Sequence, residues 1–140
     1  MLDLKLAPLV TTLALGACAS EPVASVETAS PAEAEVIYTD RLAHVSLPVA
    51  CAEFGGVLGF VSDTLAVNDP ATVARLRLAA SQATAVSDSA HEMDARLIAV
   101  VRDGGSADTL CVGGYHSAEV NGVPVKDSAL VHLLWAVVSP

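Results

Sequence analysis

The sequence predicts a small α+β domain in which a helix packs on a mainly antiparallel sheet. Apolar, partly β-branched runs alternate with Gly, Asn and Asp turn signals, which is typical of strands joined by hairpins. Residues 70–86 instead repeat their apolar positions at helical spacing. A mostly helical fold is the alternative, because residues 96–102 and 129–138 fit either period.

The composition bounds the size of the domain and excludes some classes of protein. The chain has 140 residues, of which 53% are apolar, so it can bury one core of ordinary size and is too apolar to be disordered. It carries 7 Lys and Arg against 16 Asp and Glu, a formal net charge of −9. Because phosphate binding needs a basic face, we expect no nucleic-acid partner.

The first half of the domain is predicted to hold two extended segments and one helix. Residues 36–47 favour a strand and end before Pro48, and residues 57–67 predict a second strand after glycine-rich turns. Asp69 can cap a helix that has Pro70 at its first position, where the missing N–H costs nothing. The apolar residues of one face of this helix are Val73, Leu76, Ala80, Ala83 and Val86.

The second half is predicted to contain mainly strands. Residues 96–102 fit a helix but favour a strand that turns at residues 103–106 into a strand at 109–112. Asn121-Gly122 is the strongest short hairpin signal in the chain. We expect a C-terminal strand at residues 129–138, a segment too short to span a membrane, which takes about 20 residues.

The N-terminus has the pattern of an export signal. Lys5 is the only basic residue before a run of twelve uncharged, mostly apolar residues, 6–17. This run fits the apolar region of a secretory signal peptide, and it ends in Leu15-Gly16-Ala17-Cys18. The four residues resemble the lipobox of bacterial lipoproteins.

The resemblance implies that residues 1–17 are a signal peptide and that Cys18 receives a diacylglycerol. Membrane attachment would then run through the N-terminal lipid. Ala19, where aspartate would favour inner-membrane retention, implies the outer membrane, facing the periplasm. The alternative is an ordinary cleavage after Ala19, because Ala17-Cys18-Ala19 also fits an A-x-A site and would release a soluble secreted protein.

Residues 18–35 are predicted to link the lipid to a globular domain at residues 36–140. The stretch 19–35 has four glutamates and no aromatic or basic residue, which is a tether composition. A flexible coil of this length spans roughly 20–25 Å root-mean-square. A frayed domain terminus is the other interpretation.

Cys51 and Cys111 are predicted to form a disulfide. Once Cys18 is assigned to lipid, two cysteines of an exported protein have one intramolecular pairing. Closing so long a loop contributes about 4 kcal/mol in the loop-entropy model. The alternative is a reactive thiol, although the chain has no C-x-x-C motif.

Catalytic and metal motifs are weak. His91-Glu92 begins a zinc-protease motif, but Ala95 stands where the second ligand belongs. His44, His116 and His132 are scattered, so we expect no metal and no cofactor. A Ser-His-Asp site can assemble without fixed order, yet the chain lacks the G-x-S-x-G elbow.

The most unusual cluster is the run of residues 111–116. Gly113-Gly114 either lets a ligand approach, with Tyr115 and His116 at its rim, or forms a tight turn. We therefore expect a lipid-anchored envelope protein with a non-catalytic binding or assembly role and an envelope protein partner. A small periplasmic hydrolase and a soluble secreted protein or inhibitor are the alternatives.

Overall fold

The computed structural model describes residues 33–41, 48–87, 93–114 and 116–139. The strands are β1 (Glu33–Tyr38), β2 (Asp63–Val67), β3 (Ala95–Asp103), β4 (Ser106–Gly113), β5 (Ala118–Val120) and β6 (Val123–Val125). The helical elements are the 3-10 turn η1 (Cys51–Glu53), α1 (Phe54–Leu58), α2 (Pro70–Gln82) and α3 (Ser128–Val138).

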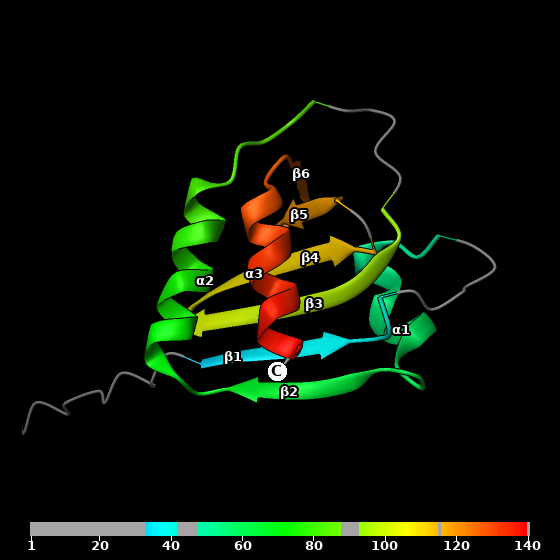
Figure 1. The fold of residues 1–140 in the computed structure, drawn as a ribbon, viewed down its shortest axis with the longest axis horizontal. Coiled ribbons are helices and arrows are strands. Elements are labelled where there is room, and N and C mark those ends of the chain that lie inside the picture. The colour runs from blue at the N-terminus through cyan, green and yellow to red at the C-terminus, as the bar shows by residue number, and fades with distance from the viewer. Residues whose placement is uncertain (1–32, 42–47, 88–92, 115, 140) are drawn as a thin grey trace, which may run out of the picture.

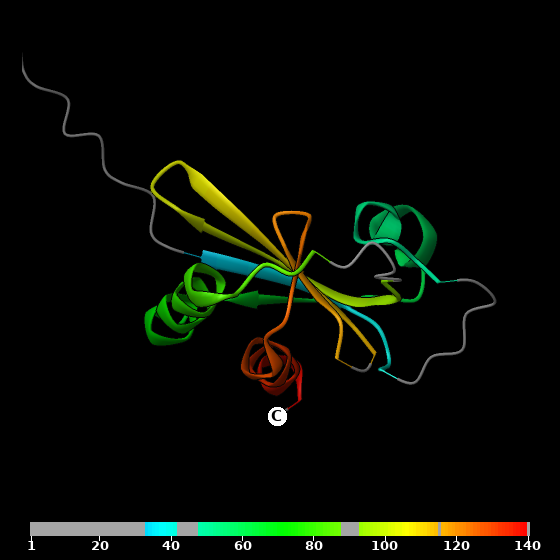
Figure 2. The ribbon, with the colours of Figure 1, turned by 90° about the horizontal axis from the view of Figure 1, so that it is seen from above.

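The six strands form one antiparallel sheet in the order β2-β1-β3-β4-β5-β6 (Figure 1). Helices α2 and α3 lie on one face, and η1 and α1 lie on the other (Figure 2). The predicted α+β class, with helical packing on an antiparallel sheet, is therefore confirmed.

Strand β3 is the centre of the sheet and pairs with β1 on one side and β4 on the other. It confirms the strand interpretation of residues 96–102. Its hairpin with β4 turns through Gly104 and Gly105, whose φ values of 53° and 101° are costly for residues with a side chain. The predicted strand at 109–112 lies within β4.

Apolar side chains pack on both faces of the sheet. The larger cluster, under α2 and α3, includes Leu97 and Leu110. The smaller cluster, under η1 and α1, is made by the buried residues Val49, Phe54, Leu58, Met93, Ala95 and Cys111. Neighbouring positions alternate between the two clusters because successive strand side chains point to opposite faces.

Helix α2 begins where the sequence predicts. The Asp69 carboxylate accepts hydrogen bonds from the Thr72 N–H at 2.9 Å and from the Thr72 hydroxyl at 2.6 Å. Val73, Leu76 and Ala80 are buried against the sheet. The helix ends at Gln82, so the last two residues of the predicted apolar face, Ala83 and Val86, lie beyond it.

The Asn121-Gly122 hairpin is also confirmed. Both residues have positive φ, 52° and 77°, in the turn between β5 and β6. The Asn121 side chain adds a restraint by accepting a hydrogen bond from the Thr109 N–H at 2.8 Å.

The predicted C-terminal strand is wrong, because residues 128–138 form helix α3. Asp127 caps this helix by accepting a hydrogen bond from the Leu130 N–H at 3.0 Å. Its buried residues, Leu130, Val131, Leu134 and Trp135, recur at helical spacing and face the larger cluster. The Asp127-Ser128 cap is the sequence signal that decides between the two periods.

Two other strand predictions hold only in part. In the predicted strand 57–67, Val57 and Leu58 belong to α1, and β2 starts only at Asp63. Strand β1 begins at Glu33, before the predicted start at residue 36, and ends at Tyr38. Residues 42–47 of that prediction lie outside the described residues.

The predicted disulfide between Cys51 and Cys111 is present, with 6.1 Å between the two Cα atoms. It joins η1 to β4, and Cys111 belongs to the smaller cluster. Across the described ranges, no helix is long and apolar enough to cross a membrane.

The helical assignment of α3 has a direct test in two alanine substitutions. Leu134 is fully buried and His132 is exposed, whereas a strand would place both on one face. We expect Leu134→Ala to lower the free energy of unfolding by about 2–5 kcal/mol and His132→Ala by less than about 0.5 kcal/mol. Urea denaturation measures both, and equal losses would contradict the helix.

The disulfide is expected to stabilise the fold mainly by restricting the unfolded chain. We expect the variant Cys51→Ala/Cys111→Ala to lose about 4 kcal/mol of unfolding free energy, the value for closing a loop of about 60 residues. Urea denaturation of the variant and of the oxidised parent measures the loss. An unchanged midpoint and slope would refute this contribution.

Candidate functional site

The structure does not bring the candidate ligand and catalytic residues of the sequence together among the residues that it describes. His116 and His132 are exposed, while Cys18, His44, His91 and Tyr115 lie outside the described residues. Within the described part of the chain, no three His, Cys, Asp or Glu side chains lie close enough together to hold a metal. The predicted ligand rim at Tyr115 and His116 stays a prediction.

The glycine pair beside that rim has a packing role. A Cβ atom on Gly113 would collide with the Ser117 hydroxyl and lie 3.0 Å from the Asp94 carbonyl oxygen. A Cβ atom on Gly114 would lie 3.0 Å from the Arg41 carbonyl oxygen. Close approach of the chain to itself therefore explains both glycines.

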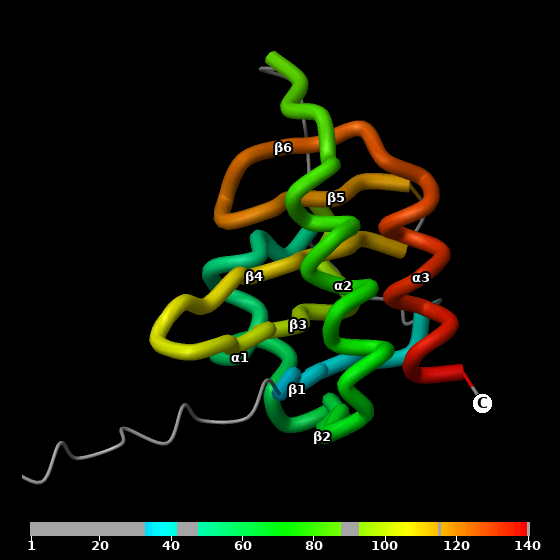
Figure 3. The backbone as a smooth tube through the Cα atoms, turned by 90° about the vertical axis from the view of Figure 1, so that its left-hand side faces the viewer, coloured from blue at the N-terminus to red at the C-terminus, as the bar shows by residue number. Residues whose placement is uncertain are grey.

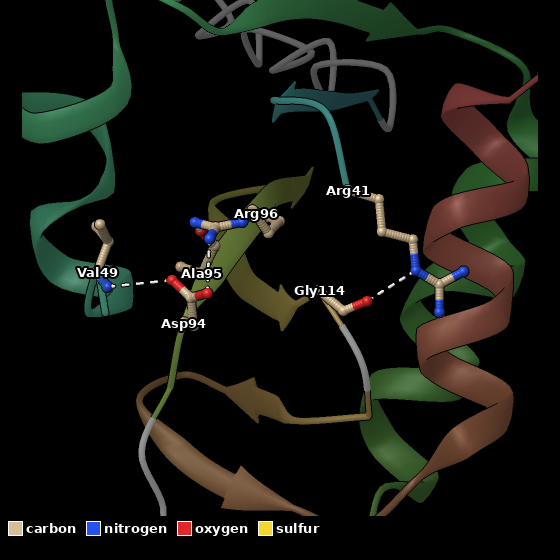
Figure 4. Close-up of polar contacts among 6 residues, drawn as sticks. All are labelled: Arg41, Val49, Asp94, Ala95, Arg96 and Gly114. Carbon is tan, nitrogen blue, oxygen red and sulfur yellow. Dashed lines mark hydrogen bonds and ion pairs between the residues drawn. The ribbon is translucent and has the colours of Figure 1, made fainter. Parts of the chain in front are cut away.

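A buried arginine lies in a hydrogen-bond network at the start of β3 (Figure 4). Arg96 is 4% exposed, and one of its Nη atoms donates to the Asp94 carboxylate at 2.6 Å. Its other Nη donates to the Ala95 carbonyl oxygen at 3.1 Å. The second oxygen of Asp94 accepts from the Val49 N–H at 3.4 Å. These bonds satisfy a buried charge, which is the condition for keeping one inside a protein.

A second arginine links the same end of the sheet to α3. Arg41 Nε donates to the Gly114 carbonyl oxygen at 2.7 Å, and the side chain points toward the helix (Figure 4). Its guanidinium carbon lies 5.5 Å from the ring centroid of Trp135, a cation–π distance. Trp135 is buried in the larger cluster. Both arginines therefore have structural contacts that account for them.

The candidate binding site is a groove of about 420 Å³ beside β2, on the helical face of the sheet. The first turns of α2 and the last turns of α3 both reach this side of the sheet (Figure 3). We call it the β2 groove. The residues that define it are Leu65, Asn68 and Thr72 near the β2–α2 junction, Arg75 on α2, and Leu133 and Val137 on α3.

The charges of the β2 groove are unequally compensated. Asp69 lies at its wall, and the Thr72 hydroxyl and N–H lower the pKa of its carboxyl by hydrogen bonding to the ionised form. Because Asp69 caps α2, the positive end of the helix offsets its charge. Arg75 is exposed and makes no ion pair within the described residues, whereas Arg77 pairs with Asp103.

The two edges of the sheet differ. The outer edge of β6 is covered by residues 84–86, since the Val86 N–H donates to the Pro124 carbonyl oxygen and the Lys126 N–H to the Thr84 carbonyl oxygen. At the other edge, no strand in the described ranges pairs with the outer side of β2. The β2 groove therefore runs beside an open strand.

An open strand beside an apolar groove suits one kind of ligand, an extended polypeptide. Its backbone can pair with the strand, while alternate side chains enter the groove. The sequence shows the cap at Asp69 but not this groove, because its walls come from segments near residues 65–75 and 133–137. The helical nature of the second segment was also missed.

Comparison with known proteins adds no family. No protein-family model matches the chain, and the searches of curated proteins and of solved structures give no match either.

The cap at the wall of the β2 groove has a testable pH signature. We expect NMR titration to give Asp69 a carboxyl pKa below its ordinary value, and Thr72→Val to raise it by removing the hydroxyl donor. The Asp69 pKa is lower in the folded protein than in the unfolded chain. The ionised cap therefore stabilises the fold fully at pH values above the unfolded pKa, and this stabilisation is lost as the pH falls through the folded pKa. The control is Thr64→Val on β2, and an unchanged Asp69 pKa in Thr72→Val would contradict this assignment.

Proposed function

We propose that this protein is exported, lipid-anchored at Cys18, and serves a non-catalytic binding or assembly role at the cell envelope. The observation that carries the proposal is the run Leu15-Gly16-Ala17-Cys18 after an apolar segment of signal-peptide length. The Cys51–Cys111 disulfide supports export, because disulfides persist mainly in oxidising compartments.

The anchor and the folded domain are compatible in length. Strand β1 starts at Glu33, fifteen positions after Cys18, and a chain of that length reaches at most about 50 Å. Each buried CH₂ of an acyl chain contributes about 0.8 kcal/mol, so two or more chains hold a protein durably at a membrane. The domain would then work within a few nanometres of the lipid surface.

The geometry of the domain supports a binding role more than any other. The β2 groove combines an apolar lining with an uncompensated arginine beside an open strand. Arg41 and Arg96, in contrast, donate hydrogen bonds to groups of the domain itself. The outer membrane, facing the periplasm, is the location that Ala19 favours.

The second candidate is a soluble secreted protein. It is favoured by Ala17-Cys18-Ala19, which offers a site for ordinary cleavage after Ala19. The two candidates share the same folded domain and differ only in the mature N-terminus.

The mature N-terminus distinguishes them. We expect intact mass of the full-length gene product, expressed in a Gram-negative host, to show a chain starting at Cys18 with acyl groups attached, and the protein to partition with membranes. We expect Cys18→Ser to lose both the acyl mass and the membrane partition, while Cys51→Ser/Cys111→Ser, the matched cysteine control, keeps the acyl groups. A mature chain that starts at Ser20 without lipid would refute the anchor.

A further inference from the structure

We propose that the β2 groove binds an extended, acidic segment of a partner protein as an added strand beside β2. This inference rests on the binding role proposed above, for which it names the site and the chemical class of the partner. It does not depend on the lipid anchor.

The first step is the open edge. In an antiparallel sheet, every second residue of an edge strand directs its N–H and C=O away from the sheet. Every second residue of the five-residue strand β2 presents such groups, and no described strand pairs with them. The opposite edge is closed by residues 84–86 and carries Pro124, which has no N–H to offer. Strand addition is therefore favoured at β2.

The second step is the apolar lining. Leu65 of β2 and Leu133 and Val137 of α3 are half-buried and line the groove on the helical side of the sheet. Every second side chain of a strand added at β2 would point to that side. These side chains are expected to be apolar, and β-branched residues suit the extended backbone.

The third step is charge. Arg75 lines the groove and has no ion-pair partner in the described part of the chain, and the exposed Asn68 lines the same groove. A guanidinium pairs best with a carboxylate, to which it can donate two hydrogen bonds. The fitting occupant is a strand with Asp or Glu placed opposite Arg75.

The test is selection from a library of random synthetic decapeptides on the full mature protein. We expect the selected peptides to alternate apolar residues and to carry Asp or Glu at one fixed position. We expect N-methylation of alternate backbone amides to abolish binding and N-methylation of the intervening amides to leave it unchanged. Amide shifts should map to residues 64–75 and 133–137.

A charge exchange makes the test specific. We expect Arg75→Glu to weaken the acidic peptides about tenfold and to select basic residues at the same position, because attraction becomes repulsion. The matched control, Lys126→Glu, makes the same change of charge at an exposed residue next to the closed edge and should leave affinity unchanged. Equal effects of the two variants, or shifts that map elsewhere, would overturn the proposal.

Two further outcomes would assign the groove to another occupant and would also overturn the proposal. A synthetic peptide of residues 19–32 that binds as tightly as the selected peptides would make the groove a site for the chain's own linker. A dimer in sedimentation that Arg75→Glu dissociates would make it an interface between copies. Each binding experiment is done on the protein with and without its lipid. A failure of the proposed anchor is thereby distinguished from a failure of peptide binding.

Discussion

The burial of the central strands on both faces is the constraint on which the rest of this structure depends. Strand β3 carries Leu97 to one face and Ile98 to the other, and β4 does the same with Leu110 and Cys111. A sheet with two apolar faces needs two covers. Helices α2 and α3 supply the larger one. The smaller cover is formed by η1 and α1, and its cluster holds six buried residues among those that the structure describes. The disulfide through Cys51 adds a covalent link between η1 and β4.

The helical cover also determines where a surface is left open. Helix α2 contacts β1, β3 and β4 as well as α3, so the helical layer lies over the middle of the sheet. Beyond it, β2 extends as an edge strand, and the space between that edge and the ends of the two helices is the β2 groove. The buried Arg96 lies in the network at the start of β3, where its contacts are all internal. Arg75 of α2, in contrast, lines the groove and makes no ion pair within the described residues.

Local chemistry made part of this fold predictable from sequence. Asp69-Pro70 and Asn121-Gly122 specify a helix start and a turn by contacts within a few residues, and both are present. The disulfide was predicted from the cysteine count and the expected export alone. The apolar residues of α3 do not distinguish a helix from a strand, because they satisfy two periods. The groove could not be predicted, since it needs α3 as a helix and residues 65 and 133 as neighbours. The predicted roles of Cys18, Tyr115 and His116 stay predictions.

The claim that β2 is the open edge of the sheet is central to this account, and amide hydrogen exchange of the folded protein tests it most directly. We expect slow exchange for the Val86 and Lys126 amides, which donate across the closed edge. Within β2 we expect alternation, with the amides bonded to β1 protected and the intervening amides exchanging rapidly. Uniform protection of all β2 amides would show that this edge is already covered, and would contradict the account.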